Sequence, residues 1–130
     1  MTEHPNATLI RRGYQAFNTG DMGFFVEHYA DDVVEHQPGH NIMSGDYKGR
    51  DNVLGFYGRL AQETGGTFRA ELQELLANDQ RVVAVHHSTA QRNGKTLDCR
   101  TALLFEFRDG KVVDVDTLDE DQAAWEEFFC

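Results

Sequence analysis

Residues 33–53, VVEHQPGHNIMSGDYKGRDNV, concentrate side chains that can do chemistry between two apolar segments. They include His36 and His40, and a histidine can act as a general base near pH 7 without much tuning of its pKa. Histidines and carboxylates this close in sequence also raise the question of a metal site. Their spacing lacks the His-x-x-x-His pattern of one helix face, and the stretch holds no pair of cysteines. We therefore expect neither a metal nor a cofactor, and we take His36 and Gln37, which point to opposite sides of their strand, as candidate pocket groups.

A second group of chemically useful side chains lies further along, where His86 and His87 precede Asp98 and Arg100. Because neighbouring residues of a strand point to opposite faces, only one of the two histidines can enter a pocket. If Asn93-Gly94 forms a two-residue hairpin turn, His87 lies opposite Arg100. Asp98 and Arg100 then share one face, either as a plain salt bridge or as an arginine that Asp98 holds for a substrate.

The apolar pattern predicts the elements that carry these residues. The first half has the period of helices, and the second half changes to a period of two, which is typical of strands. Asn93-Gly94 and Asp109-Gly110 fall between alternating segments, and such dipeptides are the strongest short signal for hairpins. We predict helices at residues 8–19, 22–30, 49–66 and 121–129, a strand beginning at 33, and an antiparallel meander of strands at 67–78, 81–91, 95–108 and 111–119. Residues 39–49 are left as a flap, with His40 and Met43 at the rim of the pocket.

Size and charge restrict the classes of function. The chain has 130 residues and a formal net charge of −10, and we expect one domain over residues 1–130. A nucleic-acid partner is not expected, because phosphate binding needs a basic face. No apolar run reaches the length of a membrane span and the start has no signal-peptide pattern, so we expect a cytoplasmic protein without membrane attachment.

The predicted helices bring large apolar side chains to one side of the molecule. A curved sheet with helices on one face gives an α+β fold, and a sheet that wraps around the helices forms a cone with a cavity of a few hundred Å³. The residues expected to form both core and pocket wall are Tyr14, Phe17, Phe56, Tyr57 and Leu60. A hydroxyl of Tyr14 or Tyr57 is suited to bond a ligand carbonyl.

Three segments carry a resemblance to a known family. YQAFNTGDMGFFVEHYADDVVEHQPG, YKGRDNVLGFYGRL and FEFRDGKVVDV together resemble the SnoaL-like branch of the NTF2-like superfamily, over about residues 8–128. That superfamily includes ketosteroid isomerases, polyketide cyclases and limonene epoxide hydrolases. The resemblance implies a conical barrel, with a curved mixed or antiparallel sheet wrapped around three N-terminal helices, a short C-terminal helix and a deep pocket. It also implies a homodimer that forms through the outer face of the sheet.

The resemblance further selects which face of the meander lines the pocket. It favours the face that carries His87, Arg100, Leu104 and Thr117, on the assumption that Leu104 lies opposite Val115. A β-bulge would invert this assignment.

The specific chemistries of the superfamily do not carry over. At the positions where the resemblance to ketosteroid isomerases implies a tyrosine, a base and a protonated aspartate, this chain has Gly13, Gln37 and Leu103 or Leu104. The catalytic set of the epoxide hydrolases is also missing, since His86, Ser88 and Thr117 stand at its positions.

We therefore expect a protein that holds a hydrophobic polyketide-, terpenoid- or steroid-like molecule. Its activity would be cofactor-free acid–base chemistry, such as isomerisation, cyclisation or hydrolysis. The candidate catalytic residues are His36 or His87 as proton carrier and Arg100 as anchor. The candidate substrate-binding residues are Tyr14, Phe17, Gln37, Phe56, Tyr57, Leu60, Leu104 and Thr117. The alternative is a binding or dimeric interaction module without catalysis.

Overall fold

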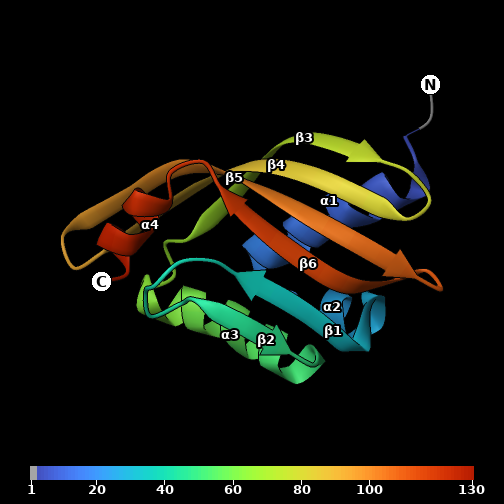
Figure 1. Cartoon of the computed structure of the whole chain (residues 1–130), viewed down its shortest axis with the longest axis horizontal. Coiled ribbons are helices and arrows are strands. Elements are labelled where there is room, and N and C mark those ends of the chain that lie inside the picture. Colours follow the sequence, from blue (N-terminus) through green and yellow to red (C-terminus); the bar gives the residue numbers. More distant parts are fainter. Residues whose placement is uncertain (1–2) are drawn as a thin grey trace.

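The computed structural model describes residues 3–130, which form four helices and six strands (Figure 1). The helices are α1 (Pro5–Thr19), α2 (Gly23–His28), α3 (Arg50–Glu63) and α4 (Gln122–Phe128). The strands are β1 (Tyr29–Gln37), β2 (Gly45–Lys48), β3 (Arg69–Ala77), β4 (Arg81–Arg92), β5 (Lys95–Arg108) and β6 (Lys111–Asp119). They form one curved sheet in the order β2-β1-β6-β5-β4-β3, with β1 parallel to β6 and the other neighbours antiparallel. The predicted α+β fold, with a mixed sheet around three helices and a short last helix, is confirmed.

The helices turn their apolar side chains toward the sheet. In α3 the buried residues Val53, Phe56, Tyr57 and Leu60 recur at intervals of three and four, which places them on one face. α1 has Pro5 in its first turn and ends at Gly20, whose φ of 78° is the left-handed conformation that favours glycine. Helices α1 to α3 thus close the concave side of the sheet, and this packing creates the space for a cavity.

The meander follows the predicted hairpins, but one pairing is shifted. His87 lies opposite Arg100, as predicted. The pairing of β5 with β6 skips a residue, because Phe107 lies opposite Val112 and Glu106 opposite Asp114. The extra residue, Val113, forms a β-bulge, and a bulge reverses which side chains of the two strands share a face. Leu104 therefore pairs with Asp116 instead of Val115.

Part of the segment that was predicted as a flap is a strand that pairs with β1. Residues 45–48 form β2, which pairs with the end of β1, so the prediction of a flap over residues 39–49 is wrong for that part. Met43 is completely buried and not at a rim. The carboxylate of Glu126 on α4 accepts hydrogen bonds from the His40 backbone N–H at 2.9 and 3.0 Å. This contact ties the loop before β2 to the last helix.

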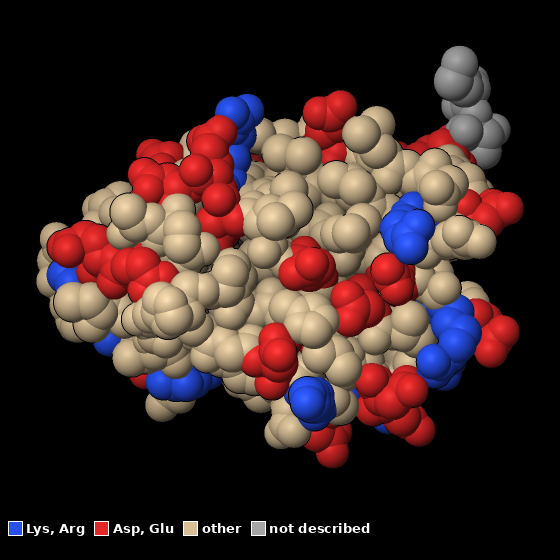
Figure 2. Space-filling view, in the orientation of Figure 1, with Lys and Arg blue, Asp and Glu red and all other residues tan. Residues whose placement is uncertain are grey.

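Many acidic side chains of the protein lie on its surface. Acidic side chains are spread over the face shown in Figure 2, with few lysines and arginines between them. No helix within residues 3–130 is long and apolar enough to cross a membrane.

The same glycine-to-alanine change should have opposite effects at two positions. Gly110 has a φ of 77° in the β5–β6 turn, so we expect Gly110→Ala to lower the free energy of unfolding by about 1 kcal/mol. Gly58 lies inside α3, and an added Cβ there meets no atom within 4 Å, so Gly58→Ala should raise it by up to about 1 kcal/mol. Urea unfolding of the two variants measures both changes, and a loss of stability in Gly58→Ala would contradict the assignment.

Candidate functional site

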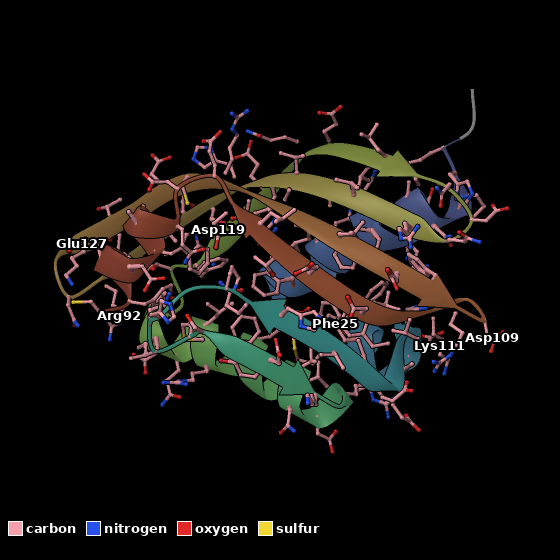
Figure 3. All side chains as sticks on the ribbon, in the orientation of Figure 1. Phe25, Arg92, Asp109, Lys111, Asp119 and Glu127 are labelled. Atoms are coloured by element: carbon pink, nitrogen blue, oxygen red, sulfur yellow. The ribbon has the colours of Figure 1, made fainter. Side chains whose placement is uncertain are left out.

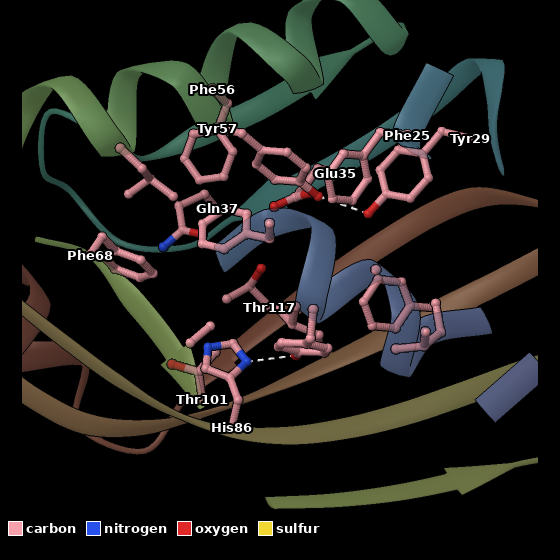
Figure 4. A pocket seen from close by; sticks show the side chains of 18 of the residues that line it. Phe25, Tyr29, Glu35, Gln37, Phe56, Tyr57, Phe68, His86, Thr101 and Thr117 are labelled. Atoms are coloured by element: carbon pink, nitrogen blue, oxygen red, sulfur yellow. Dashed lines mark hydrogen bonds between the residues drawn. The ribbon is translucent and has the colours of Figure 1, made fainter. Parts of the chain in front are cut away.

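A cavity lies between the helices and the concave face of the sheet (Figure 4). Its volume is about 80 Å³. Because an enclosed water takes about 10–15 Å³, the cavity has room for roughly five to eight non-hydrogen atoms. This is smaller than the few hundred Å³ expected from the sequence. Most of the wall is aromatic or aliphatic, and most of its polar side chains belong to one of two hydrogen-bonded groups.

The first polar group is centred on Glu35 of β1. The Tyr57 hydroxyl on α3 donates a hydrogen bond to Glu35 Oε1 at 2.6 Å. The hydroxyl oxygens of Tyr29 and Tyr57 are 2.8 Å apart, so Tyr29 donates to Tyr57, whose own proton is used on Glu35. The other carboxyl oxygen, Glu35 Oε2, has no hydrogen-bond partner among residues 3–130. A carboxyl group with one oxygen committed and one uncommitted therefore lies in the wall of the cavity.

Burial controls the pKa of Glu35. Loss of solvation raises the pKa of this carboxyl to about 7, while the Tyr57 hydrogen bond and the charge of His36 act in the opposite direction. A group with a pKa near the working pH can both accept and return a proton. Glu35 thus has the position and the pKa of a general acid–base group.

The second polar group is a chain of hydrogen bonds along the opposite wall. The Tyr14 hydroxyl is 2.6 Å from His86 Nδ1, His86 Nε2 is 3.0 Å from Ser88 Oγ, and Ser88 Oγ is 3.3 Å from Thr101 Oγ1. The Thr101 hydroxyl donates to Asp119 Oδ1 at 2.8 Å. Asp119 lies at the end of β6 beside α4 (Figure 3). The chain therefore leads from the cavity to a carboxylate at one end of the sheet.

The acceptor at the end of this chain fixes the direction of every bond in it. Since Thr101 donates to Asp119, Ser88 donates to Thr101, and His86 donates to Ser88 through Nε2. His86 Nδ1 is then an acceptor, and the Tyr14 hydroxyl donates to it. Burial lowers the pKa of His86 to about 4, which keeps the ring neutral and supports this tautomer.

His36 lies on the outer face of β1 and does not line the cavity. Its Nδ1 donates to Asp46 of β2 and its Nε2 to Asp114 of β6, each at 2.8 Å. These carboxylates, Asp46 first, raise the pKa of His36 and favour the charged ring. The predicted role of His36 as a proton carrier in the cavity is wrong. Its ring instead connects β1 to β2 and β6 through the two carboxylates.

Three other candidates also point away from the cavity. His87 pairs with Asp98, Arg100 pairs with Glu120, and Leu104 lies on the same outer face. The physical reason is the bulge at Val113, which places Thr117 on the inner face together with Leu103 and not with Leu104. The prediction that His87, Arg100 and Leu104 line the pocket is therefore wrong.

The remaining candidates do line the cavity: Tyr14, Phe17, Gln37, Phe56, Tyr57, Leu60 and Thr117. Their contacts with a substrate stay predictions. Of the two histidines left open by the sequence, His86 lines the cavity, whereas Glu35, which is central to it, was missed. Glu35 lies two positions before Gln37, so the period of a strand puts both on one face, and this signal was available in the sequence.

The described part of the chain holds no cluster of three histidine, cysteine or carboxylate side chains suited to a metal ion. The pairs around His36 and the chain ending at Asp119 are both internal hydrogen-bond networks. Among the side chains that line the cavity, the Glu35 carboxyl is the acidic group.

Comparisons with known proteins agree with this architecture. The model of the SnoaL-like domain family matches residues 10–115. An uncharacterised protein of Mycobacterium tuberculosis is 35% identical over 131 residues, which covers 100% of both chains. The structure of Bal32a, from a soil-derived mobile gene cassette, has a TM-score of 0.93 and 43% identity over 96% of each chain. A putative SnoaL-like polyketide cyclase from Jannaschia sp. has a TM-score of 0.79 at 14% identity, over 100% of this chain and 98% of that one, which shows the fold alone.

The raised pKa of Glu35 should appear in the stability of the protein. Between the ordinary carboxyl pKa of 4.5 and the folded value of about 7, the folded state holds a proton that the unfolded state has lost. The contribution of Glu35 is thus fully present below pH 4.5 and falls by roughly 3 kcal/mol as the pH rises through 7. Glu35→Gln imitates the protonated form, so its stability relative to wild type should increase by that amount from pH 4.5 to 8.

Urea unfolding of both proteins across this pH range measures the difference. Other titrating groups cancel in the comparison because both proteins contain them. A difference that does not change with pH would mean that Glu35 has an ordinary pKa.

Proposed function

Because the chain belongs to the SnoaL-like domain family, we propose that it is a cofactor-free enzyme that moves a proton on a small, largely apolar molecule in its cavity, with Glu35 as the acid–base group. The observation that carries the proposal is the Glu35 carboxyl itself. It is buried inside the cavity, its pKa is raised to about 7, and Oε2 has no protein partner within residues 3–130. A carboxylate in this state can take a proton from an acidic C–H or O–H group and return it at another atom.

The rest of the wall fits this chemistry. Phe17, Phe56 and Leu60 supply an apolar surface that excludes water from the reacting atoms. Tyr57 holds the carboxyl in one orientation, and Tyr29 holds Tyr57. Because these hydroxyls are already committed as donors, their role is to position Glu35.

The volume of the cavity limits the size of the substrate. A molecule of roughly five to eight non-hydrogen atoms fits without movement of the wall. A polyketide- or steroid-sized compound fits only if the wall opens. The loop that Glu126 of α4 holds lies next to Gln37, and its movement would open the wall at that point.

The test is hydrogen exchange on a small ketone. In D₂O the protein should catalyse deuterium incorporation next to the carbonyl of cyclohexanone, and the rate should rise with pH through about 7 as Glu35 ionises. Glu35→Gln should lower the enzymatic rate by about 100-fold or more. Glu71→Gln, an exposed glutamate on β3, is the matched control and should not change the rate.

The rival function is a binding module without catalysis. Binding of the ketone without exchange in wild type, or exchange that Glu35→Gln does not change, would favour this rival. The two readings share the same cavity, so only the dependence on Glu35 separates them.

We also propose that residues 1–130 act as one domain in a cytoplasmic homodimer. Leu76 of β3 and Leu118 of β6, 60% and 61% exposed, support a contact through the outer face of the sheet. Sedimentation equilibrium should give the mass of a dimer, and Leu118→Glu should give that of a monomer.

A further inference from the structure

Three residues that line the cavity, Gln37, Thr117 and Trp125, each have a buried polar atom without a hydrogen-bond partner among the described residues. Gln37 is 6% exposed and Thr117 is 5% exposed. Within residues 3–130, Gln37 Nε2 and Thr117 Oγ1 make no hydrogen bond, although both residues line the cavity. A buried polar group without a partner costs about 1–3 kcal/mol, so Gln37 Nε2 and Thr117 Oγ1 are suited to bond a polar atom inside the cavity.

The sheet places these two side chains next to each other. β1 and β6 run parallel, with Glu35 beside Val115 and His36 beside Asp116, so the next position in this register sets Gln37 beside Thr117. Figure 4 shows both side chains reaching into the space between the two walls of the cavity. Glu35 lies two positions before Gln37 on the same face, a distance of about 7 Å along the strand. Glu35 and Gln37 thus lie in one row on β1, and Thr117 lies across from Gln37 on β6.

The other hydroxyl donors of the cavity are already used. Tyr14 donates to His86, Tyr57 donates to Glu35, and Tyr29 donates to Tyr57. Thr101 donates to Asp119. The indole N–H of Trp125 is also unpaired but lies against the Cys99 thiol. A ligand oxygen in the centre of the cavity therefore finds its donors at Gln37 and Thr117.

Among the described residues, the cavity wall carries no positively charged side chain. None of the residues described as lining it is lysine or arginine, and Arg100 lies outside, paired with Glu120. His86 is neutral, and Glu35 is the acidic group of the wall. Transfer of an anion into such a site is unfavourable because nothing in the wall compensates its charge.

We propose that Gln37 and Thr117 together bind the carbonyl oxygen of a small neutral ketone or related carbonyl compound, and so determine which atom of the substrate faces Glu35. One carbonyl oxygen has two lone pairs, which accept one bond from the Gln37 amide and one from the Thr117 hydroxyl. The bound oxygen and the atom that exchanges its proton with Glu35 are then separated by only a few bonds. The proposal gives the substrate class for the function proposed above and rests on it.

The experiment uses cyclohexanone, labelled with ¹³C at the carbonyl, as the probe. In the complex with wild type, the infrared C=O stretch should shift to lower frequency than in a non-hydrogen-bonding solvent. Gln37→Met and Thr117→Val, which keep the volume of the side chains, should each weaken binding by about 3- to 10-fold and move the band back. Their thermal stability without ligand should stay equal to wild type or increase, because each removes an unpaired buried polar atom.

The controls separate this pair from general effects. Thr89→Val removes the same hydroxyl from an exposed position on β4 and should change neither the band nor the affinity. Cyclohexanecarboxylate, an anion of similar size, should bind at least 10-fold more weakly than the ketone. Absent binding of the ketone, an unshifted band, unchanged binding by Gln37→Met and Thr117→Val, or a preference for the anion would each overturn the proposal.

Failure of the proposed function has a different signature. Glu35→Gln should still bind cyclohexanone with a shifted band while hydrogen exchange is lost. Binding with a shifted band but no exchange in wild type would remove the catalytic role of Glu35 and leave the oxygen site at Gln37 and Thr117 intact.

Discussion

The hydrogen bond from Tyr57 to Glu35 is the interaction on which the cavity depends. A carboxyl group inside an apolar cone is costly unless it is hydrogen-bonded or protonated, and the protein uses both routes. Tyr57, supported by Tyr29, satisfies one oxygen, and burial raises the pKa of the carboxyl to about 7. A cation in direct contact would have held Glu35 ionised at every physiological pH. The charge of His36, separated from Glu35 by the plane of the sheet, lowers the pKa only in part, so the proton remains exchangeable.

Most of the fold could be predicted from local signals, whereas the identity of the inner face could not. The turns at Asn93-Gly94 and Asp109-Gly110 and the period of two predict the β4–β5–β6 meander. Side chains of a strand alternate between its two faces, however, so one extra residue at Val113 reverses which of them point into the cavity. Val113 is a β-branched residue in an apolar run and carries no sequence mark of a bulge. The assignments of His87, Arg100 and Leu104 failed together because they shared this one assumption.

The missed residues show a different limit. Gln37 draws attention because it stands where the resemblance to isomerases implies a base, yet Glu35 on the same face is the carboxyl that the cavity contains. The alternation of Val33, Glu35 and Gln37 was visible, but a glutamate is rarely buried, so composition alone favours an exposed position. Burial of Glu35 follows from the packing of α3 over β1, which brings Tyr57 within reach. β2 was missed for a similar reason, because its four residues gain their strand conformation from pairing with β1.

The distribution of hydrogen bonds separates the polar residues of the cavity into two kinds. Along one wall, the direction of donation runs from Tyr14 through His86 to Asp119, and this chain has no free donor to offer. Such a closed network stabilises the shape of the wall and fixes one tautomer of His86. Gln37 Nε2 and Thr117 Oγ1 differ because they have no hydrogen-bond partner among the described residues, although the register of β1 with β6 brings the two residues to neighbouring positions. The parallel pairing of β1 with β6 therefore does more than close the sheet, since it sets two unused polar groups next to Glu35 in a wall where all other hydroxyl donors are occupied.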